Sequence, residues 1–205
     1  MPLFLALAIA AVAPPAGPAF DCRRAALPVE RMICADPRLA AYDRAIAALY
    51  RTELAKRRRA GAAPAQKAWL AERNLCASPG CVLERHRERF LDLAAAGNMN
   101  AQALRRREDP DSSLEIAPVG GGWFMFYATD LWVYPGGSNA NTAESGGVFR
   151  LAGNRGEFEG GAGCTILFQP LPGRRWQLTE AGKGAGMPCG GGLNTSLSGV
   201  YGPEK

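Results

Sequence analysis

The spacing of apolar positions changes from helical to strand-like about half-way along the chain. Between residues 36 and 59, apolar side chains recur every three or four positions, which places them on one face of a helix. Asp36 is a suitable N-cap and Pro37 suits the first helical position, while Gly61 breaks the pattern. The apolar stripe of this predicted helix consists of Leu39, Tyr42, Ala45, Ile46, Leu49 and Tyr50.

Two more segments of helical periodicity follow, at residues 65–77 and 81–96, and a Ser-Pro-Gly sequence separates them. A short helix or turn is predicted ahead of the long helix, at residues 27–34. Residues 20–96 are therefore predicted to form a helical hairpin whose second arm is broken.

From residue 113 onward, short runs of β-branched and aromatic residues alternate with glycine, proline and asparagine. A turn signal about every ten residues predicts a small antiparallel β-sandwich or barrel over residues 114–205. Asn-Arg-Gly at 154–156 and Pro-Gly-Arg-Arg at 172–175 are predicted hairpin turns. The polar segment 97–113 is predicted to be a solvated linker. The predicted fold class is α+β, a disulfide-stapled helical hairpin domain followed by a small β-domain.

Residues 1–19 have the pattern of a secretory signal peptide, an apolar stretch followed by small residues and proline. The apolar run is too short to span a bilayer, and no later stretch reaches the required length, so no integral membrane segment is expected in the mature chain. Cys22 lacks the Leu-x-x-small sequence that precedes a lipid-modified cysteine. The mature protein is predicted to begin near Phe20 and to be periplasmic or secreted.

An exported chain with an even number of cysteines is expected to form disulfides. Three stripes of apolar residues in a small helical domain bury little surface, so covalent staples are also needed for stability. The cysteine spacing does not match a zinc site and His86 is the only histidine, so neither a metal nor a cofactor is predicted. The six cysteines are Cys22, Cys34, Cys76, Cys81, Cys164 and Cys189.

Antiparallel packing of the helices favours one bridge pattern over another. It places the start of the long helix beside residues 76–81, so Cys34 is expected to bridge to Cys76 or Cys81 and Cys22 to the remaining one. The local pairs Cys22–Cys34 and Cys76–Cys81 stay open as the alternative. The two cysteines of the second half are predicted to pair with each other.

A pattern of apolar, charged and cysteine positions extends over most of the first half. Its members are Phe20, Asp21, Cys22, Val29, Glu30, Ile33, Cys34, Asp36, Pro37, Leu39, Asp43, Tyr50, Gln66, Trp69, Leu70, Arg73, Cys76, Cys81 and Arg89. The pattern resembles the N-terminal domain of the LprI-type lysozyme inhibitor family. The resemblance implies a place in the bacterial periplasm or envelope and a lysozyme as partner. His86 stands where that family usually has an aromatic residue, so we expect it to be a packing residue.

The two halves differ in charge. Residues 20–108 contain 18 Lys and Arg against 10 Asp and Glu, a net charge of +8, and residues 109–205 contain 6 against 9, a net charge of −3. A basic animal lysozyme would be attracted by carboxylates, so a contact is expected from the acidic second half or from the edge formed by Glu30, Asp36 and Asp43. The basic runs have no interleaved aromatic residues, so no nucleic-acid partner is predicted.

Charged residues that share the apolar stripes are expected to pair inside the helical half, because buried charges persist only when they are paired. The predicted network consists of Glu30, Asp36, Asp43, Arg73 and Arg89.

The sequence lacks the usual catalytic patterns, so a non-catalytic binding protein is predicted. Trp123 and Trp132 are candidates for a sugar-stacking surface, and Ser198 and Tyr201 resemble a loop of membrane-bound C-type lysozyme inhibitors, one residue short in spacing. The alternative to an inhibitor is a structural or adaptor module that binds peptidoglycan or an envelope protein. The sequence contains no signal for an oligomeric state.

Overall fold

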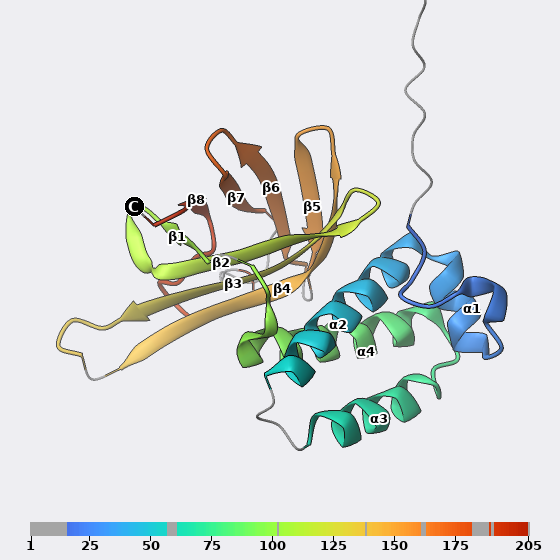
Figure 1. The fold of residues 1–205 in the computed structure, drawn as a ribbon. Helices are drawn as coiled ribbons and strands as arrows, with labels where there is room; N and C mark the ends of the chain where they lie inside the picture. Colours follow the sequence, from blue (N-terminus) through green and yellow to red (C-terminus); the bar gives the residue numbers. More distant parts are fainter. Residues whose placement is uncertain are drawn as a thin grey trace, which may run out of the picture.

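A computed structural model describes residues 16–56, 61–101, 103–137, 139–160, 163–181, 189 and 191–204 of the 205-residue chain. These residues form four α-helices followed by a closed eight-stranded barrel, and the helices pack against the outside of the barrel (Figure 1). The predicted signal peptide lies outside the described residues, apart from 16–19.

The helical half matches the predicted hairpin with a broken second arm. Helix α2 (Pro37–Ala55) forms the first arm, and α3 (Ala62–Arg73) and α4 (Pro79–Leu93) form the second. A short helix, α1 (Pro28–Ala35), precedes them. The predicted N-cap is confirmed, since an Asp36 carboxylate oxygen accepts hydrogen bonds from the backbone N–H groups of Arg38, at 2.7 Å, and Leu39, at 3.3 Å.

The second half is an up-and-down antiparallel barrel. Each strand pairs with the next along the chain, and β8 pairs with β1 to close the sheet into a barrel. Both predicted hairpins are confirmed, between β4 and β5 and between β6 and β7. The strands are β1 (Leu104–Arg106), β2 (Asp109–Gly120), β3 (Trp123–Val133), β4 (Ala140–Ala152), β5 (Arg155–Glu159), β6 (Thr165–Leu171), β7 (Arg175–Ala181) and β8 (Gly199–Gly202).

The prediction of a solvated linker over residues 97–113 is wrong from Leu104 onward, because β1 and the start of β2 lie in this range. Arg105 and Arg106 give β1 no apolar alternation from which a strand could be predicted. Arg106 is nevertheless needed at the closure of the barrel, where it pairs with Tyr201 in register and its guanidinium donates to an Asp130 carboxylate oxygen at 2.9 Å.

The bridge pattern favoured for the first four cysteines is also wrong. The disulfides are local, Cys22–Cys34 and Cys76–Cys81, with Cα–Cα distances of 5.9 and 5.5 Å. The two regions do meet, since Cys76 packs in one apolar cluster with Ile33 of α1, but the chain ahead of α1 turns back and brings Cys22 closer to Cys34. The predicted Cys164–Cys189 bridge is confirmed.

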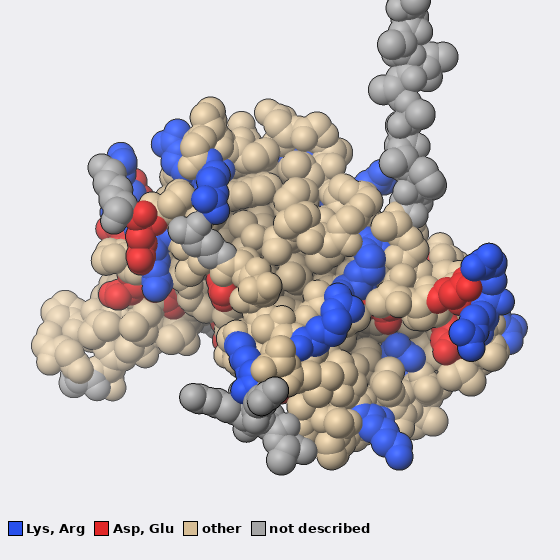
Figure 2. Space-filling model, in the orientation of Figure 1, with Lys and Arg blue, Asp and Glu red and all other residues tan. Residues whose placement is uncertain are grey.

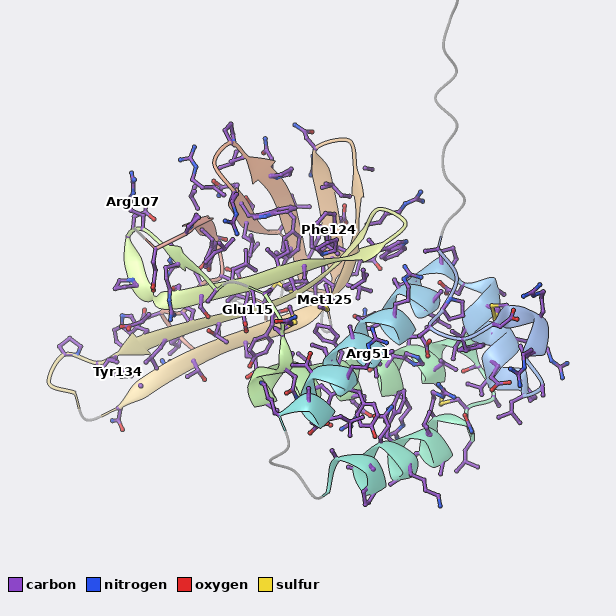
Figure 3. The ribbon with its side chains drawn as sticks, viewed as in Figure 1. Arg51, Arg107, Glu115, Phe124, Met125 and Tyr134 are labelled. Carbon is purple, nitrogen blue, oxygen red and sulfur yellow. A yellow bond between two sulfur atoms is a disulfide. The ribbon has the colours of Figure 1, made fainter. Side chains whose placement is uncertain are left out.

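The helices and the barrel share a hydrophobic core. Tyr42 and Phe90 from the helices pack in one cluster with Met125 and Val148 from the outer face of the sheet. Figure 3 labels Met125 and its neighbour Phe124, which alternate along β3 so that Met125 serves this shared core and Phe124 the barrel interior. Gly146 allows the close approach of α4, because a β-carbon there would lie 3.0 Å from the Leu91 side chain.

Candidate binding surfaces

A groove of about 520 Å³ lies at the junction of the helices and the barrel. Helices α2 and α4 form one wall, and the outer face of β3, β4 and β5 forms the other. Its size is that of a small-molecule site. The side chains that matter to its chemistry are Arg38, Tyr42, Arg87, Trp123, Arg150 and Arg155.

The strand register explains how the barrel side of the groove is built. Side chains alternate between the two faces of a strand, so every second residue of β5 points outward while Gly156 and Phe158 face the interior. Arg150 of β4 pairs with Glu157 on one side and with Trp123 on the other. An indole ring, a guanidinium and a carboxylate therefore form one row across three strands.

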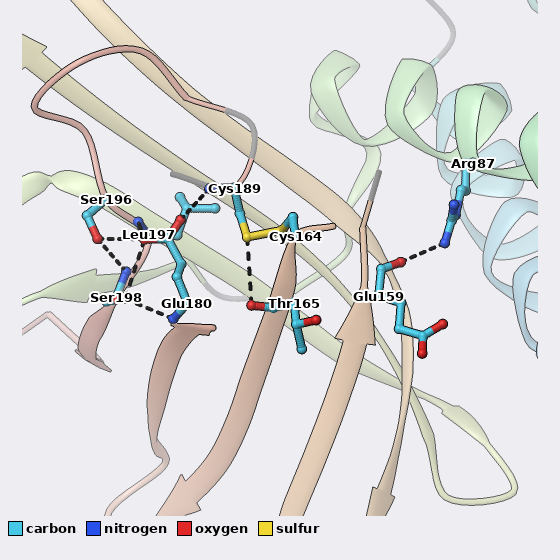
Figure 4. The surroundings of a disulfide bond; sticks show 9 residues. All are labelled: Arg87, Glu159, Cys164, Thr165, Glu180, Cys189, Ser196, Leu197 and Ser198. Atoms are coloured by element: carbon cyan, nitrogen blue, oxygen red, sulfur yellow. Dashed lines mark hydrogen bonds between the residues drawn. A yellow bond between two sulfur atoms is a disulfide. The ribbon is translucent and has the colours of Figure 1, made fainter. Parts of the chain in front are cut away.

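Positive charge exceeds negative charge in the groove. The four guanidinium groups face two carboxylates, those of Glu157 and Glu159. Arg38 lies 3.5 Å from Glu159, but the Arg38 side chain is partly exposed and the Glu159 side chain largely exposed, so this ion pair is weak. Arg87 uses its terminal nitrogens to donate to the backbone oxygen of Glu159, at 2.6 Å, and to Glu84, at 3.4 Å (Figure 4).

Tyr42 is the most deeply buried polar side chain of the groove. Only 1% of it is exposed, and burial raises the pKa of its hydroxyl. The hydroxyl lies near the Arg87 guanidinium and the Val148 backbone, yet no described residue makes a well-formed hydrogen bond to it. Gly147 leaves room for the ring, since a β-carbon there would lie 2.5 Å from the Tyr42 hydroxyl oxygen.

A second candidate surface is the arm that β3 and β4 form beyond the barrel wall at residues 131–143, together with the segment 191–193 that lies beside it. Strand β2 pairs with β3 only as far as Thr129, so the ends of β3 and β4 pair with each other to Val133 and Ala140. The segment 191–193 runs along the arm, where the Asn141 amide donates to the Leu193 backbone oxygen at 2.6 Å. Figure 1 shows the arm projecting from the rest of the barrel.

The arm is uncharged and carries exposed apolar side chains. No Asp, Glu, Lys or Arg occurs between positions 131 and 143. In Figure 2 the corresponding lobe is free of blue and red, whereas Lys and Arg side chains lie along α2. Several apolar side chains of the arm are exposed in part, namely Leu131 at 37%, Val133 at 46%, Tyr134 at 37% and Leu193 at 63%.

The two candidate tryptophans are not brought together. Trp123 lines the groove, while Trp132 lies on the arm, where its ring packs edge-on against Tyr134 with the ring centres 4.3 Å apart. Trp132 follows Trp123 by nine positions along extended strand β3, so their Cα atoms lie about 30 Å apart. They belong to different surfaces, and the structure forms no single aromatic platform from both.

Ser198 and Tyr201 lie in the closure of the barrel. Tyr201 is completely buried, and its hydroxyl donates to the Leu197 backbone oxygen at 3.1 Å. Ser198 is half-buried, and its hydroxyl accepts from the Glu180 backbone N–H at 2.9 Å. Glu180 in turn accepts from the Cys189 backbone N–H at 2.8 Å, which ties this network to the Cys164–Cys189 disulfide (Figure 4). A partner could reach Tyr201 only if the barrel opened.

Within the helical half, two buried ion pairs replace the single predicted network. Arg73 lies 3.7 Å from Asp43, and Arg89 lies 3.7 Å from Glu53, with all four side chains nearly inaccessible. Arg89 also donates to the Gln66 side-chain oxygen at 3.1 and 2.9 Å. Glu53 was not among the predicted residues, although it follows Leu49 by four positions and thus continues the buried face of α2.

Glu30 and Asp36 lie outside these pairs. Glu30 accepts from the backbone N–H groups of Ala26, at 2.8 Å, and Leu27, at 3.0 Å, and so caps α1, and these hydrogen bonds lower the pKa of its carboxyl. Asp36 caps α2. Both are charges at helix N-termini, where the helix dipole favours a carboxylate.

His86 is a packing residue, as expected. It is completely buried between Trp69 and Tyr42, with ring centres 5.5 and 6.5 Å away, and its Nδ1 lies 2.7 Å from the Val82 backbone oxygen. Burial lowers the pKa of the imidazole to about 4, with a smaller contribution from the Arg73 charge in the same direction.

We expect this histidine to make stability depend on pH. Between pH 6.5 and about 4 the unfolded chain takes up a proton at His86 that the folded protein does not, so the free energy of unfolding falls as the pH falls. The slope from this group is at most about 1.4 kcal/mol per pH unit. Urea unfolding of the wild type and of His86→Phe across this range should show a smaller slope for the variant. Equal slopes would contradict the assignment, because all other titrating groups are the same.

Part of the chain is similar to a mycobacterial lipoprotein. The relatives are each named lipoprotein LprI, from Mycobacterium bovis and from two strains of Mycobacterium tuberculosis, and they share 34% identity with this chain over 87 residues. The match covers 40% of this chain and 44% of each relative, so the chain spans less than half the length of the curated relatives it matches. No family model matches the chain, and no solved structure matches it significantly.

The similarity to LprI and the three disulfides point to an extracytoplasmic protein. In the part of the chain that the structure describes, no helix combines the length and apolar character needed to cross a membrane. Within the same residues, no three His, Cys, Asp or Glu side chains lie together as metal ligands would.

Proposed function

We propose that this protein is an exported binding protein of the bacterial envelope, periplasmic or secreted, which acts without catalysis as an inhibitor of lysozymes. The observation that carries the proposal is the β3–β4 arm, an uncharged projection with exposed apolar side chains at Val133 and Leu193. The partial similarity to LprI supports the class of partner, through the resemblance to LprI-type inhibitors.

The charges of the molecule favour the arm over the helical half as the contact with a lysozyme. A lysozyme of an animal host is basic, and residues 20–108 are basic as well, so docking through the helices would bring like charges together. The edge of Glu30, Asp36 and Asp43 does not offset this, since the first two carboxylates cap helices and Asp43 is buried against Arg73. An uncharged arm avoids the repulsion and can enter a concave site.

The test is inhibition of lysozymes by the purified chain. At micromolar concentration the wild type should reduce the activity of at least one among chicken-type, goose-type and invertebrate-type lysozymes. Val133→Asp and Leu193→Asp should each weaken inhibition by about tenfold or more, as expected for a charge placed in an apolar contact.

The matched control is Leu75→Asp, which adds the same charge at a leucine that is 85% exposed in the connection between α3 and α4. It should inhibit like the wild type. No inhibition by the wild type would remove the inhibitor role, and equal inhibition by the arm variants would remove the arm from the contact.

A second candidate function is a structural or adaptor module that binds peptidoglycan or an envelope protein. The specific observation in its favour is the groove, in which Trp123 lies beside several arginines. Co-sedimentation with purified cell-wall sacculi at moderate salt tests this function, and a chain that stays in the supernatant would count against it.

A further inference from the structure

We propose that the groove between the helices and the barrel binds an anionic saccharide, with a sugar ring against Trp123 and an acid group held by arginines and the Tyr42 hydroxyl. The proposal deepens the second candidate function and rests on it for the class of ligand. It does not depend on lysozyme inhibition, which is assigned to the arm.

The charge of the groove favours an anionic ligand. Four guanidinium groups against two carboxylates leave the groove with an excess of positive charge, although the barrel half as a whole is acidic. Arg150 and Arg155 are exposed, and the ion pair of Arg38 with Glu159 is weak, so these guanidinium groups can bind a ligand at low cost. Guanidinium groups bind carboxylate and phosphate oxygens through paired hydrogen bonds.

Two buried polar atoms of residues that line the groove make no well-formed hydrogen bond to any described residue. One is the Tyr42 hydroxyl, on a side chain that is only 1% exposed, and the other is Nε of Arg87. An unpaired buried polar atom destabilises the folded protein, so such atoms call for a partner. Both atoms are donors and belong to residues that line the groove, and an acid oxygen of a ligand would accept from them.

Trp123 and Glu157 are placed to bind the sugar part of the ligand. Trp123 lines the groove and pairs with Arg150 in register, so a ring stacked on the indole would bring its substituents to the guanidinium. Glu157 lies across from Arg150 on β5 and can accept hydrogen bonds from sugar hydroxyls. A sugar ring that carries hydroxyl groups and an acid group could contact all three side chains.

Three monosaccharides that share the N-acetylglucosamine ring test the proposal, with binding followed by chemical-shift titration of the isotope-labelled full chain. N-acetylmuramic acid has a carboxylate, N-acetylglucosamine 6-phosphate has a phosphate, and N-acetylglucosamine has neither. At least one acidic sugar should bind at millimolar concentration and shift the Trp123 indole N–H signal, and the neutral sugar should bind about tenfold more weakly. The two acidic probes show which acid group the site prefers.

Two variants locate the site. Tyr42→Phe removes only the unpaired hydroxyl, so we expect affinity to fall about tenfold while the melting temperature stays the same or rises. Arg150→Ala should weaken binding by a similar factor. Arg107→Ala is the matched control, because Arg107 is an exposed arginine in the turn between β1 and β2, at the end of the barrel away from the helices (Figure 3).

Several results would overturn the proposal. They are equal affinity for the neutral sugar, no binding of either acidic sugar, or a loss in Arg107→Ala as large as in Arg150→Ala. A Tyr42→Phe variant that melts at a lower temperature and binds normally would show that the hydroxyl only supports the fold. Each of these results is independent of the lysozyme assay, so the groove and the inhibitor function can fail separately.

Discussion

Replacing Asp43 with alanine is expected to lower the free energy of unfolding by about 3 kcal/mol, because it leaves Arg73 charged and buried without its carboxylate. Arg73 is only 6% exposed and lies 3.7 Å from Asp43. The backbone N–H of Ala19, which donates to Asp43 at 2.8 Å, would also lose its acceptor. Arg73 keeps its hydrogen bonds to the Asn74 side chain and its contact with the Trp69 ring, so we expect the lower end of the range for broken buried pairs.

The control for this prediction is the double variant Asp43→Leu with Arg73→Met. Burial raises the pKa of Asp43 and lowers the pKa of Arg73, so for both groups desolvation exceeds the gain from pairing. Removing the whole pair should therefore restore stability to within about 1 kcal/mol of the wild type. Urea unfolding measures both variants. A double variant as unstable as the single one would show that the pair contributes net stability.

Replacing Phe126 with alanine should cost about 3–5 kcal/mol, the usual loss for a buried aromatic residue. Phe126 is completely buried at the centre of the barrel. Its ring meets Phe158 and Phe168 edge-on, with the ring centres 4.9 and 4.7 Å apart. A third ring contact, with Phe149 at 6.0 Å between ring centres, completes the cluster. Neighbouring rings are fixed by the closed sheet and cannot fill the cavity by collapse.

Phe126→Leu provides the comparison, since it keeps most of the volume and should cost less than about 1.5 kcal/mol. Each variant should unfold in a single urea transition, with the same dependence of the free energy of unfolding on urea concentration as the wild type. The near-ultraviolet circular dichroism spectrum of Phe126→Ala should keep its wild-type shape. A loss below about 1 kcal/mol for the alanine variant would mean that the barrel interior repacks freely.

Local patterns of the helical half could be predicted because their causes lie within a few residues. The caps, the first-turn prolines and the apolar stripe of α2 all act along one helix, and the structure confirms the N-cap at Asp36. The buried position of His86 also follows from helical spacing. The pairing of Asp43 with Arg73 agrees with the predicted internal network, but the partners of Arg89 were not predicted. Glu53 and Gln66 meet Arg89 across three helices, and spacing along one helix does not show which residues face each other.

Short polar strands could not be predicted. In β1, Arg105 and Arg106 look like a solvated linker, and their place in a sheet depends on pairing with β8, about a hundred residues later. The local disulfide pattern also depends on tertiary structure, because the path of the chain ahead of α1 brings Cys22 close to Cys34. In both cases the path of the backbone through the folded protein decided the contact, and local sequence patterns do not determine that path.

The amino-acid sequence by itself determined that the chain has a helical half and a strand-rich half, that its cysteines pair, and that its first half resembles LprI-type inhibitors. These features depend on periodicity, turn residues and residue identity, which are local. Only the tertiary structure decided that the sheet closes, that Met125 and Val148 dock the helices on it, and that Tyr42 and Trp123 share a groove. The reason is that the groove and the shared core form where segments far apart in the sequence pack together. That packing depends on the arrangement of whole helices and strands and not on local sequence.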